Sequence, residues 1–371
     1  MKILILQDRL RLGGTEVQAL ALGQQWLDLG HEIRLIVFRS GGQLADSPAA
    51  KKLAPKILQP FATWLDGWAP GLEKAVTEFQ PDVVVAFGRE ANAKLPRLRK
   101  LSPQPWLVAT LRSGRDQPAR FWRALRGADA VIANARWAAD EAVTQGVPKE
   151  KTQTIYSGLA RRPIADDAAA ARAGWRKNAR TPEGAVVLLC VAGFRRGKGQ
   201  DVLLRAVAQL PPEPAWQIWF AGDGPWLEPC KKIAAELRLK NQVRFTGLAQ
   251  DPAPLYAAAD VAVMASLAEA LPNFLIEAQA AGLPVVATAV GGVPECFEPG
   301  VTGIAVPDGD PVALITALSQ AIRDHAWRAA AKAPAQARAQ ELFDAQRNAA
   351  KWLEAFTAKA LSAPRQNFIP E

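Results

Sequence analysis

The chain has 371 residues, of which 49% are hydrophobic, and a formal net charge of +9 at pH 7. This length favours two domains over a single core, and no apolar run reaches the roughly 20 residues that span a bilayer. Residues 1–6 have the pattern of a short strand without a signal-peptide cleavage site. The cysteines are odd in number and far apart, which argues against disulfides or a zinc site and favours reduced thiols in a cytosolic protein: Cys190, Cys230 and Cys296.

The positive charge is concentrated in the first half. Residues 1–180 hold 28 Lys and Arg against 17 Asp and Glu, a net +11, whereas the remainder has 17 against 19, a net −2. Basic runs at 94–100 and 112–126 lie among or near the tryptophans Trp64, Trp68, Trp106 and Trp122. This combination is typical either of an anionic membrane contact or of solvated helix faces over core aromatics. Nucleic acid is disfavoured, because no recognised nucleic-acid module appears.

Strands and helices alternate along the first half. Residues 15–29 have a helical apolar face, and Gly30 ends that helix. Alternation of this kind predicts parallel α/β layers. Six segments have the pattern of strands: 2–7, 32–38, 82–87, 106–111, 130–133 and 152–156.

A polar, Ala-rich stretch at 159–184 interrupts the alternation and predicts an interdomain segment. A second α/β series follows, with helices at 198–209 and 227–239 and an Ala-rich helical region at 311–360. The strands of this series are expected at 185–192, 218–221, 243–246, 261–264, 284–288 and 303–306. The predicted domains are therefore an N-terminal one at 1–160, a linker at 161–184, a C-terminal one at 185–340, and a last helix and tail at 341–371.

Two glutamates flank one predicted helix start. Glu269 lies in the loop after the strand at 261–264, and Glu277 lies on the helix that follows. Loops at the carboxyl ends of parallel strands are where open α/β sheets bind ligands, and free N–H groups at a helix start favour anions. Two acids beside such a helix end suit a sugar nucleotide, because carboxylates accept hydrogen bonds from hydroxyls while the helix end holds the diphosphate.

Glycine-rich turns follow the first strand of each half. Lys198 ends the turn Gly193-Phe-Arg-Arg-Gly-Lys-Gly199, where cations at a helix start suit a diphosphate. Gly13 and Gly14 follow the first strand and allow close approach of a ligand to the backbone. A dinucleotide dehydrogenase is excluded, because it would need G-x-G-x-x-G here.

The order and spacing of these motifs resemble the retaining glycosyltransferases of family 4, which have the GT-B fold. The resemblance covers nearly the whole chain and centres on the E-x7-E region, Glu269 to Glu277. It implies two Rossmann-like α/β domains whose parallel sheets face a central cleft, with the last helix crossing back to the first domain. Further motifs that carry it include Gly13–Glu16, Ala133–Trp137, Ile155–Gly158, Phe220–Pro225, Val290–Glu295 and Gly300–Gly303.

The resemblance also implies roles for individual residues. Glu277 corresponds to the acid that binds the nucleotide ribose, and Glu269 to the acid that holds the transferred sugar. Lys198 corresponds to a phosphate ligand; Gly193 stands where the family usually has a phosphate-binding Arg, and either Arg195 or Arg196 is expected to replace it. Backbone N–H groups of Asn273, Phe274 and Leu275 would face the donor, with Gly222 beside the base.

The first domain departs from the family in lacking a histidine near the sugar. Thr110, Arg112 and Ser113 occupy the corresponding stretch and are expected on the acceptor side. The turn Asp308-Gly-Asp310 resembles a D-x-D metal motif of another fold, but its place in the chain favours a plain turn, so no metal is expected.

The sequence therefore predicts a retaining, metal-independent glycosyltransferase that needs no cofactor. It would move a sugar from a nucleoside-diphosphate donor to a cell-envelope glycan or lipid-linked acceptor, in the cytoplasm and in contact with the inner face of the inner membrane. Two alternatives stay open: a catalytically degenerate sugar-nucleotide-binding protein and a peripheral membrane adaptor.

Overall fold

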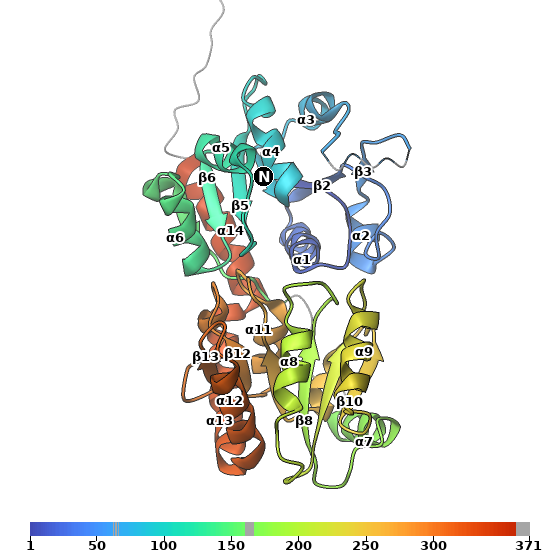
Figure 1. Ribbon diagram of the computed structural model, residues 1–371. Coiled ribbons are helices and arrows are strands. Elements are labelled where there is room, and N and C mark those ends of the chain that lie inside the picture. The colour runs from blue at the N-terminus through green and yellow to red at the C-terminus, as the bar shows by residue number, and fades with distance from the viewer. Residues whose placement is uncertain (62, 64, 66, 160–166, 361–371) are drawn as a thin grey trace, which may run out of the picture. The chain divides into compact units, whose positions relative to one another are not determined.

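The computed structural model describes residues 1–61, 63, 65, 67–159 and 167–360 (Figure 1). Trp64, the first six residues of the predicted linker (161–166) and the tail after residue 360 lie outside this part of the chain. The chain divides into two compact units. The first contains Met1–Arg112, Asp116–Ala160 and Ala345–Glu371, and the second contains Ser113–Arg115 and Arg161–Asp344.

The first unit is built on a parallel sheet of seven strands in the order β3-β2-β1-β4-β5-β6-β7. Its order reverses between β1 and β4, as in doubly wound nucleotide-binding folds. The strands are β1 (Lys2–Gln7), β2 (Glu32–Val37), β3 (Lys56–Ile57), β4 (Val83–Phe87), β5 (Trp106–Leu111), β6 (Ala130–Ala133) and β7 (Thr152–Thr154). The helices are α1 (Gly14–Asp28), α2 (Pro48–Leu53), α3 (Leu72–Phe79), α4 (Arg89–Leu98), α5 (Ala119–Gly127), α6 (Arg136–Thr144), the 3₁₀ turn η1 (Lys149–Lys151) and α14 (Ala345–Ala360).

The second unit has a parallel sheet of six strands in the order β10-β9-β8-β11-β12-β13, which reverses between β8 and β11. The strands are β8 (Val186–Val191), β9 (Trp216–Ala221), β10 (Val243–Gly247), β11 (Val261–Met264), β12 (Val285–Thr288) and β13 (Gly303–Val306). The helices are α7 (Ala168–Asn178), α8 (Gln200–Val207), α9 (Leu227–Glu236), α10 (Ala253–Ala258), α11 (Asn273–Ala280), the 3₁₀ turn η2 (Val293–Glu295), α12 (Pro311–Arg323) and α13 (His325–Phe343).

Each unit has its own apolar core, formed by the inner strands and the helices packed on them. Strands such as β4 are buried along their whole length, as expected for parallel sheets covered on both faces. The three cysteines are buried and free, and burial raises the pKa of the Cys190 thiol to about 12. Among the described residues, no helix is long and apolar enough to cross a membrane.

The last helix, α14, completes the core of the first unit (Figure 1). Trp352 packs edge-on against Trp26, with ring centroids 5.8 Å apart, and stacks on Phe87 at the same distance. Phe356 lies 5.5 Å from Trp26, whose indole Nε1 donates to the carbonyl of Ala349. Asp344 separates α14 from α13, so the helical region predicted at 311–360 consists of three helices.

Trp352→Ala should destabilise the first unit by about 3–5 kcal/mol, because it removes a fully buried ring and leaves a cavity. Urea unfolding of the full chain, followed by circular dichroism, measures the change. Glu354→Ala alters the exposed face of the same helix and should shift the unfolding free energy by less than about 0.5 kcal/mol. Equal shifts in the two variants would contradict the assignment of Trp352 to the core.

Candidate functional site

Lys198 and Glu269 form an ion pair at the point where the order of the second sheet reverses. Lys198 lies in the loop after β8, and Glu269 lies in the loop after β11, which is the neighbouring strand. Lys198 Nζ contacts Glu269 Oε1, and the two side chains are only 18% and 13% exposed. Carboxyl ends of strands at such a reversal are the usual ligand sites of open α/β sheets. The pair therefore presents both signs of charge where a ligand would bind.

The backbone fixes both loops that carry the pair. Leu267 N–H donates to the carbonyl of Gly197 at 2.9 Å, which joins the β11 loop to the β8 loop. Thr288 Oγ1 donates to the carbonyl of Ser266 at 2.7 Å, and Gly292 N–H reaches the carbonyl of Glu269 at 3.4 Å. The Glu269 segment is thus held from both neighbouring strands, which limits its movement.

Two glycines allow these loops to approach one another. Gly199 has φ +72°, and a Cβ there would lie 1.8 Å from the carbonyl oxygen of Ala265. Gly222, predicted to border the base, has φ +146°, and its Cβ would lie 2.1 Å from the carbonyl oxygen of Ala192. Only glycine fits both the backbone angle and the space.

Glu277 lies on α11 and is bound by a tyrosine that the sequence analysis did not identify. Tyr256, at the end of α10, is buried, and its hydroxyl donates to Glu277 Oε2 at 2.6 Å. Its ring stacks on Phe274, with centroids 6.2 Å apart and an interplanar angle of 19°. Tyr256 therefore orients the carboxylate and packs the first turn of α11 at the same time.

The first turn of α11 supplies backbone donors next to Glu269. Pro272 is the N-cap residue, and no side chain caps this helix. The side chains of Phe274 and Leu275 are buried in the core, whereas Asn273 is partly exposed. The Leu275 amide already donates to the Pro272 carbonyl at 3.1 Å, but a helix start without a side-chain cap, beside a lysine, still favours a phosphate group.

Arg195 and Arg196 differ in their surroundings. The Arg196 guanidinium lies 4.6 Å from the ring centroid of Trp226, a cation–π contact. Arg195 is exposed, and its Nε lies 3.8 Å from where a Cβ of Gly193 would stand. The Arg195 side chain thus approaches the space beside Gly193, the position at which the resemblance leads one to expect an arginine.

The candidate residues of the first unit do not form one group. Gly13 caps α1 without a side-chain hydrogen bond, and Gly14 is the first residue of that helix. Arg112 donates to Ser157 Oγ at 2.7 Å, and burial lowers the pKa of its guanidinium to about 10, so it stays charged at neutral pH. Ser113 Oγ accepts from the Arg115 amide at 3.2 Å, and the segment Ser113–Arg115 groups with the second unit.

Thr110 does not fit its expected role as an acceptor-side residue. Its side chain is buried inside the sheet, where Oγ1 donates to the carbonyl of Ala86 at 2.8 Å. Because the hydroxyl proton is used by the neighbouring strand, Thr110 holds β5 to β4 and offers no free donor to a ligand.

The aspartates of the turn at 308–310 have a local role. Asp310 caps α12 by accepting from the Ala313 amide at 2.9 Å. Within the described part of the chain, no group of three or more His, Cys, Asp or Glu side chains is placed to hold a metal.

Asp8 is a second residue that sequence reasoning missed. It directly follows β1 and accepts hydrogen bonds from the amides of Glu90 and Ala91 at 3.1 and 2.6 Å, at the start of α4. The pKa of Asp8 is raised to about 7, mainly by burial and to a smaller extent by the charges of Glu90 and Glu16, although the two amide hydrogen bonds act to lower it. A polar residue directly after an apolar strand was the available signal.

The second unit is a doubly wound fold with an ion pair at its switch point, and comparison with known proteins identifies the family. Residues 185–324 match the profile described as glycosyl transferases group 1, and residues 12–160 match glycosyltransferase family 4. The chain belongs to this family and is a glycosyltransferase with the GT-B fold. The resemblance stated from the sequence is thereby confirmed.

Individual relatives agree with this assignment. The lipopolysaccharide core biosynthesis glycosyltransferase LpsE of Rhizobium meliloti (strain 1021) is 30% identical over 253 residues, covering 67% of this chain and 68% of LpsE. The putative colanic acid biosynthesis glycosyltransferase WcaL of Salmonella typhimurium (strain LT2) is 24% identical over 361 residues, and the match covers 81% of this chain and 86% of WcaL. The structure of Anabaena HepE in complex with UDP-glucose matches with a TM-score of 0.81 and 25% identity. The match covers 96% of this chain and 100% of HepE.

Gly222→Ala should destabilise the second unit by about 1–3 kcal/mol or more, because the new methyl group meets the Ala192 carbonyl at an unfavourable φ. Thermal unfolding of the full chain measures the loss. Gly193→Ala is the matched control: its Cβ would meet nothing closer than 3.8 Å, so its midpoint should stay near that of the wild type. Comparable losses in both variants would refute the close-approach argument.

Asp8→Asn should change how stability depends on pH. Since the folded-state pKa of Asp8 is raised to about 7, its protonated form contributes stability that is fully present below about pH 4 and lost as pH rises to about 7. Asparagine keeps an oxygen acceptor for one of the two amides and does not titrate. Relative to the wild type, the variant should therefore gain on the order of a few kcal/mol between pH 4 and 8.

Chemical denaturation at a series of pH values tests this, with the exposed Asp140→Asn on α6 as control. If the free energy of unfolding of the wild type and of Asp8→Asn depended on pH in the same way, the ionisation of Asp8 would not affect stability, and the prediction would be wrong.

Proposed function

We propose that the chain transfers a sugar from a nucleoside-diphosphate sugar to an acceptor hydroxyl, with retention of configuration and without a metal. The observation that carries this proposal is the Lys198–Glu269 pair at the switch point, with Glu277 on α11, the helix that follows Glu269. In this arrangement the diphosphate lies against Lys198 and the amides of α11. Glu269 accepts from hydroxyls of the sugar, and Glu277 accepts from the ribose.

Lys198 can serve the carboxylate and the diphosphate together. An ammonium has three donors, so one can remain on Glu269 while the others reach phosphate oxygens. Arg195 adds a second cation beside Gly193, and it is favoured over Arg196, whose guanidinium is stacked on Trp226. Cations and helix amides fixed in advance stabilise the charge that develops on the leaving diphosphate, which is the work a metal would otherwise do.

The transfer step breaks the bond between the anomeric carbon and the phosphate oxygen, and its electron pair passes to the diphosphate. The acceptor hydroxyl attacks the same face of the sugar, and its proton goes to an oxygen of the leaving diphosphate. Configuration is retained, and no side chain forms a covalent bond. Glu269 acts by holding sugar hydroxyls rather than by attacking the anomeric carbon.

The donor and acceptor classes are inferred from relatives. HepE is described in complex with UDP-glucose, and LpsE and WcaL are named for lipopolysaccharide core and colanic acid synthesis. We therefore take UDP-hexoses as the first donors to test and a cell-envelope glycan or lipid-linked saccharide as the acceptor.

Contact with the cytoplasmic face of a membrane would suit a lipid-linked acceptor. Ile57, Phe61 and Leu65 are exposed in the first unit, at 46%, 64% and 62%, and the first half of the sequence carries the net positive charge. Apolar side chains next to basic residues favour an anionic bilayer. Flotation with anionic vesicles at low salt tests this; the absence of binding would remove the membrane part of the proposal.

Lys198→Ala and Glu277→Ala should each lower kcat/KM for sugar transfer by about 100-fold or more, because each removes a charged ligand of the donor. Release of nucleoside diphosphate from candidate donors and acceptors measures turnover, and calorimetry with nucleoside diphosphates measures binding. The exposed Lys232→Ala on α9 is the charge-matched control and should behave as the wild type.

The same assays distinguish the alternatives. Tight donor binding without turnover on any acceptor would favour the degenerate binding protein. Turnover at the wild-type rate in Lys198→Ala or Glu277→Ala would contradict the roles given to them.

A further inference from the structure

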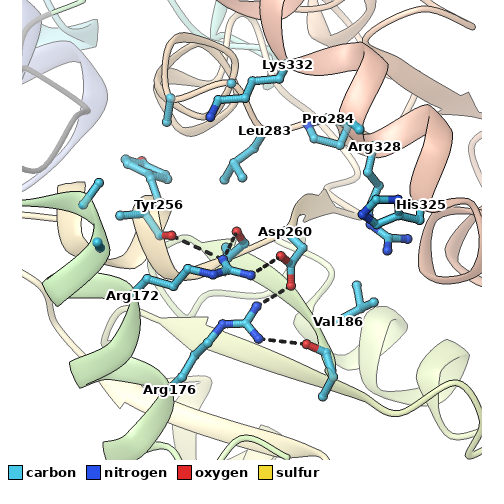
Figure 2. A pocket seen from close by; sticks show the side chains of 18 of the residues that line it. Arg172, Arg176, Val186, Tyr256, Asp260, Leu283, Pro284, His325, Arg328 and Lys332 are labelled. Carbon is cyan, nitrogen blue, oxygen red and sulfur yellow. Dashed lines mark hydrogen bonds and ion pairs between the residues drawn. The ribbon is translucent and has the colours of Figure 1, made fainter. Parts of the chain in front are cut away.

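The second unit has a large pocket at the opposite ends of its strands from Lys198 and Glu269. Val186 begins β8, Asp260 directly precedes β11, and Pro284 directly precedes β12, and all three line the pocket (Figure 2). Its volume is about 690 Å³, which is within the range of about 300–1,000 Å³ typical of small-molecule sites. None of its charged side chains takes part in the donor mechanism.

One wall of the pocket is a fixed arginine pair. Arg172 and Arg176, on α7, both contact the carboxylate of Asp260 (Figure 2). Arg172 Nη1 also donates to the carbonyls of Ala258 and Ala259 at 3.1 and 3.2 Å, at the carboxyl end of α10. These bonds hold the guanidinium groups in place, so that little side-chain freedom would be lost on binding an anion.

Asp260 cannot neutralise the pocket. Its Oδ2 accepts from the Val187 amide at 2.7 Å in addition to Arg176, and its single charge faces two guanidinium groups. The cationic side chains that line the pocket are Arg172, Arg176, Arg328 and Lys332, whereas Asp260 is its only carboxylate among the described residues. The pocket therefore has a surplus of positive charge.

The opposite wall carries an unbalanced pair of cations on α13. Arg328 and Lys332 are four residues apart, a spacing at which like charges on a helix repel each other. Arg328 Nη1 donates to the carbonyls of Ala321 and Ile322 at 2.6 and 2.7 Å. Lys332 Nζ has no hydrogen bond or ion pair with any described residue. Figure 2 shows these side chains across the pocket from Arg172 and Arg176.

Apart from His325 and Tyr256, the rest of the lining is alanine, glycine and larger apolar residues. Val186, Leu283 and Pro284 present apolar surface, and several alanines leave room beside it. A phosphate group matches arginine and lysine donors, but an inorganic phosphate alone fills only a small part of the volume. Cations on two walls and apolar surface between them fit a phosphate that is attached to a compact organic group.

We propose that this pocket binds a small organic phosphate at a site separate from the donor site. The phosphate lies between the α7 arginines and Lys332, and the organic group lies on Val186, Leu283 and Pro284. The proposal does not depend on the sugar-transfer function, because none of the four cations belongs to the donor machinery.

Calorimetry of the full chain with mannose 6-phosphate tests the proposal, with mannose and inorganic phosphate as comparison ligands. The sugar phosphate should bind more tightly than inorganic phosphate, and mannose should not bind. Binding should persist when UDP saturates the donor site. Equal affinity for inorganic phosphate, or complete loss of binding in the presence of UDP, would overturn the proposal.

Lys332→Glu should weaken the binding of mannose 6-phosphate by at least about tenfold, because it replaces a charge-assisted donor with a repelling carboxylate. Lys232→Glu makes the same charge change on α9, outside the pocket, and should leave the affinity unchanged. UDP affinity should stay the same in both variants, which shows that the donor site is intact. Equal weakening in the two variants, or no detectable binding to the wild type at millimolar ligand, would refute the site.

Discussion

The ion pair between Lys198 and Glu269 is the interaction on which the functional assignment depends. It crosses the reversal of strand order between β8 and β11, and so it joins two loops whose paired residues are 71 positions apart in sequence. The pair is largely buried, which strengthens its attraction and raises the cost of separating it without a replacement partner. A diphosphate and a hydroxylated sugar are such replacements: one supplies negative charge to Lys198, and the other supplies hydrogen-bond donors to Glu269. The pair has no net charge of its own, and both of its members can be satisfied by a ligand with these two features.

Much of the fold could be predicted because its signals are local. Buried strands of four to six residues and glycines after helices mark the alternation, and nearly every predicted strand lies within two residues of an observed one. The E-x7-E spacing likewise placed Glu269 in a loop and Glu277 on a helix. The sequence did not reveal hydrogen-bond partners that come from other helices or strands. Tyr256 reaches Glu277 from α10, and Thr110 gives its hydroxyl to Ala86 on the adjacent strand. Neither contact leaves a periodic pattern, since each depends on which side chains the sheet brings together.

The two ends of the second sheet use charge in different ways. At the carboxyl ends, glycines shape the loops, and Lys198 and the start of α11 lie where we propose that the donor binds. At the amino ends, arginines from α7 and α13 bind the carboxyl-terminal carbonyls of α10 and α12, where cations complement the helix dipole. Tyr256 borders both regions: it is one of the residues that line the pocket between α7 and α13, and its hydroxyl binds Glu277. The geometry of Glu277 therefore rests on a buried side chain that also borders this pocket.

The position of α14 has a consequence for folding. The first unit is not one continuous segment: Trp26 and Phe87 lie early in the chain, whereas the rings that complete their cluster, Trp352 and Phe356, come from the last described helix. The second unit is continuous from residue 167 to Asp344 apart from the short segment Ser113–Arg115, so nearly all its contacts can form without waiting for the chain end. Closing the first core across more than 250 residues costs loop entropy that only those late aromatic contacts offset. The aromatic cluster must therefore be strong, and its four rings, packed edge-on or stacked within 6 Å of one another, meet that requirement.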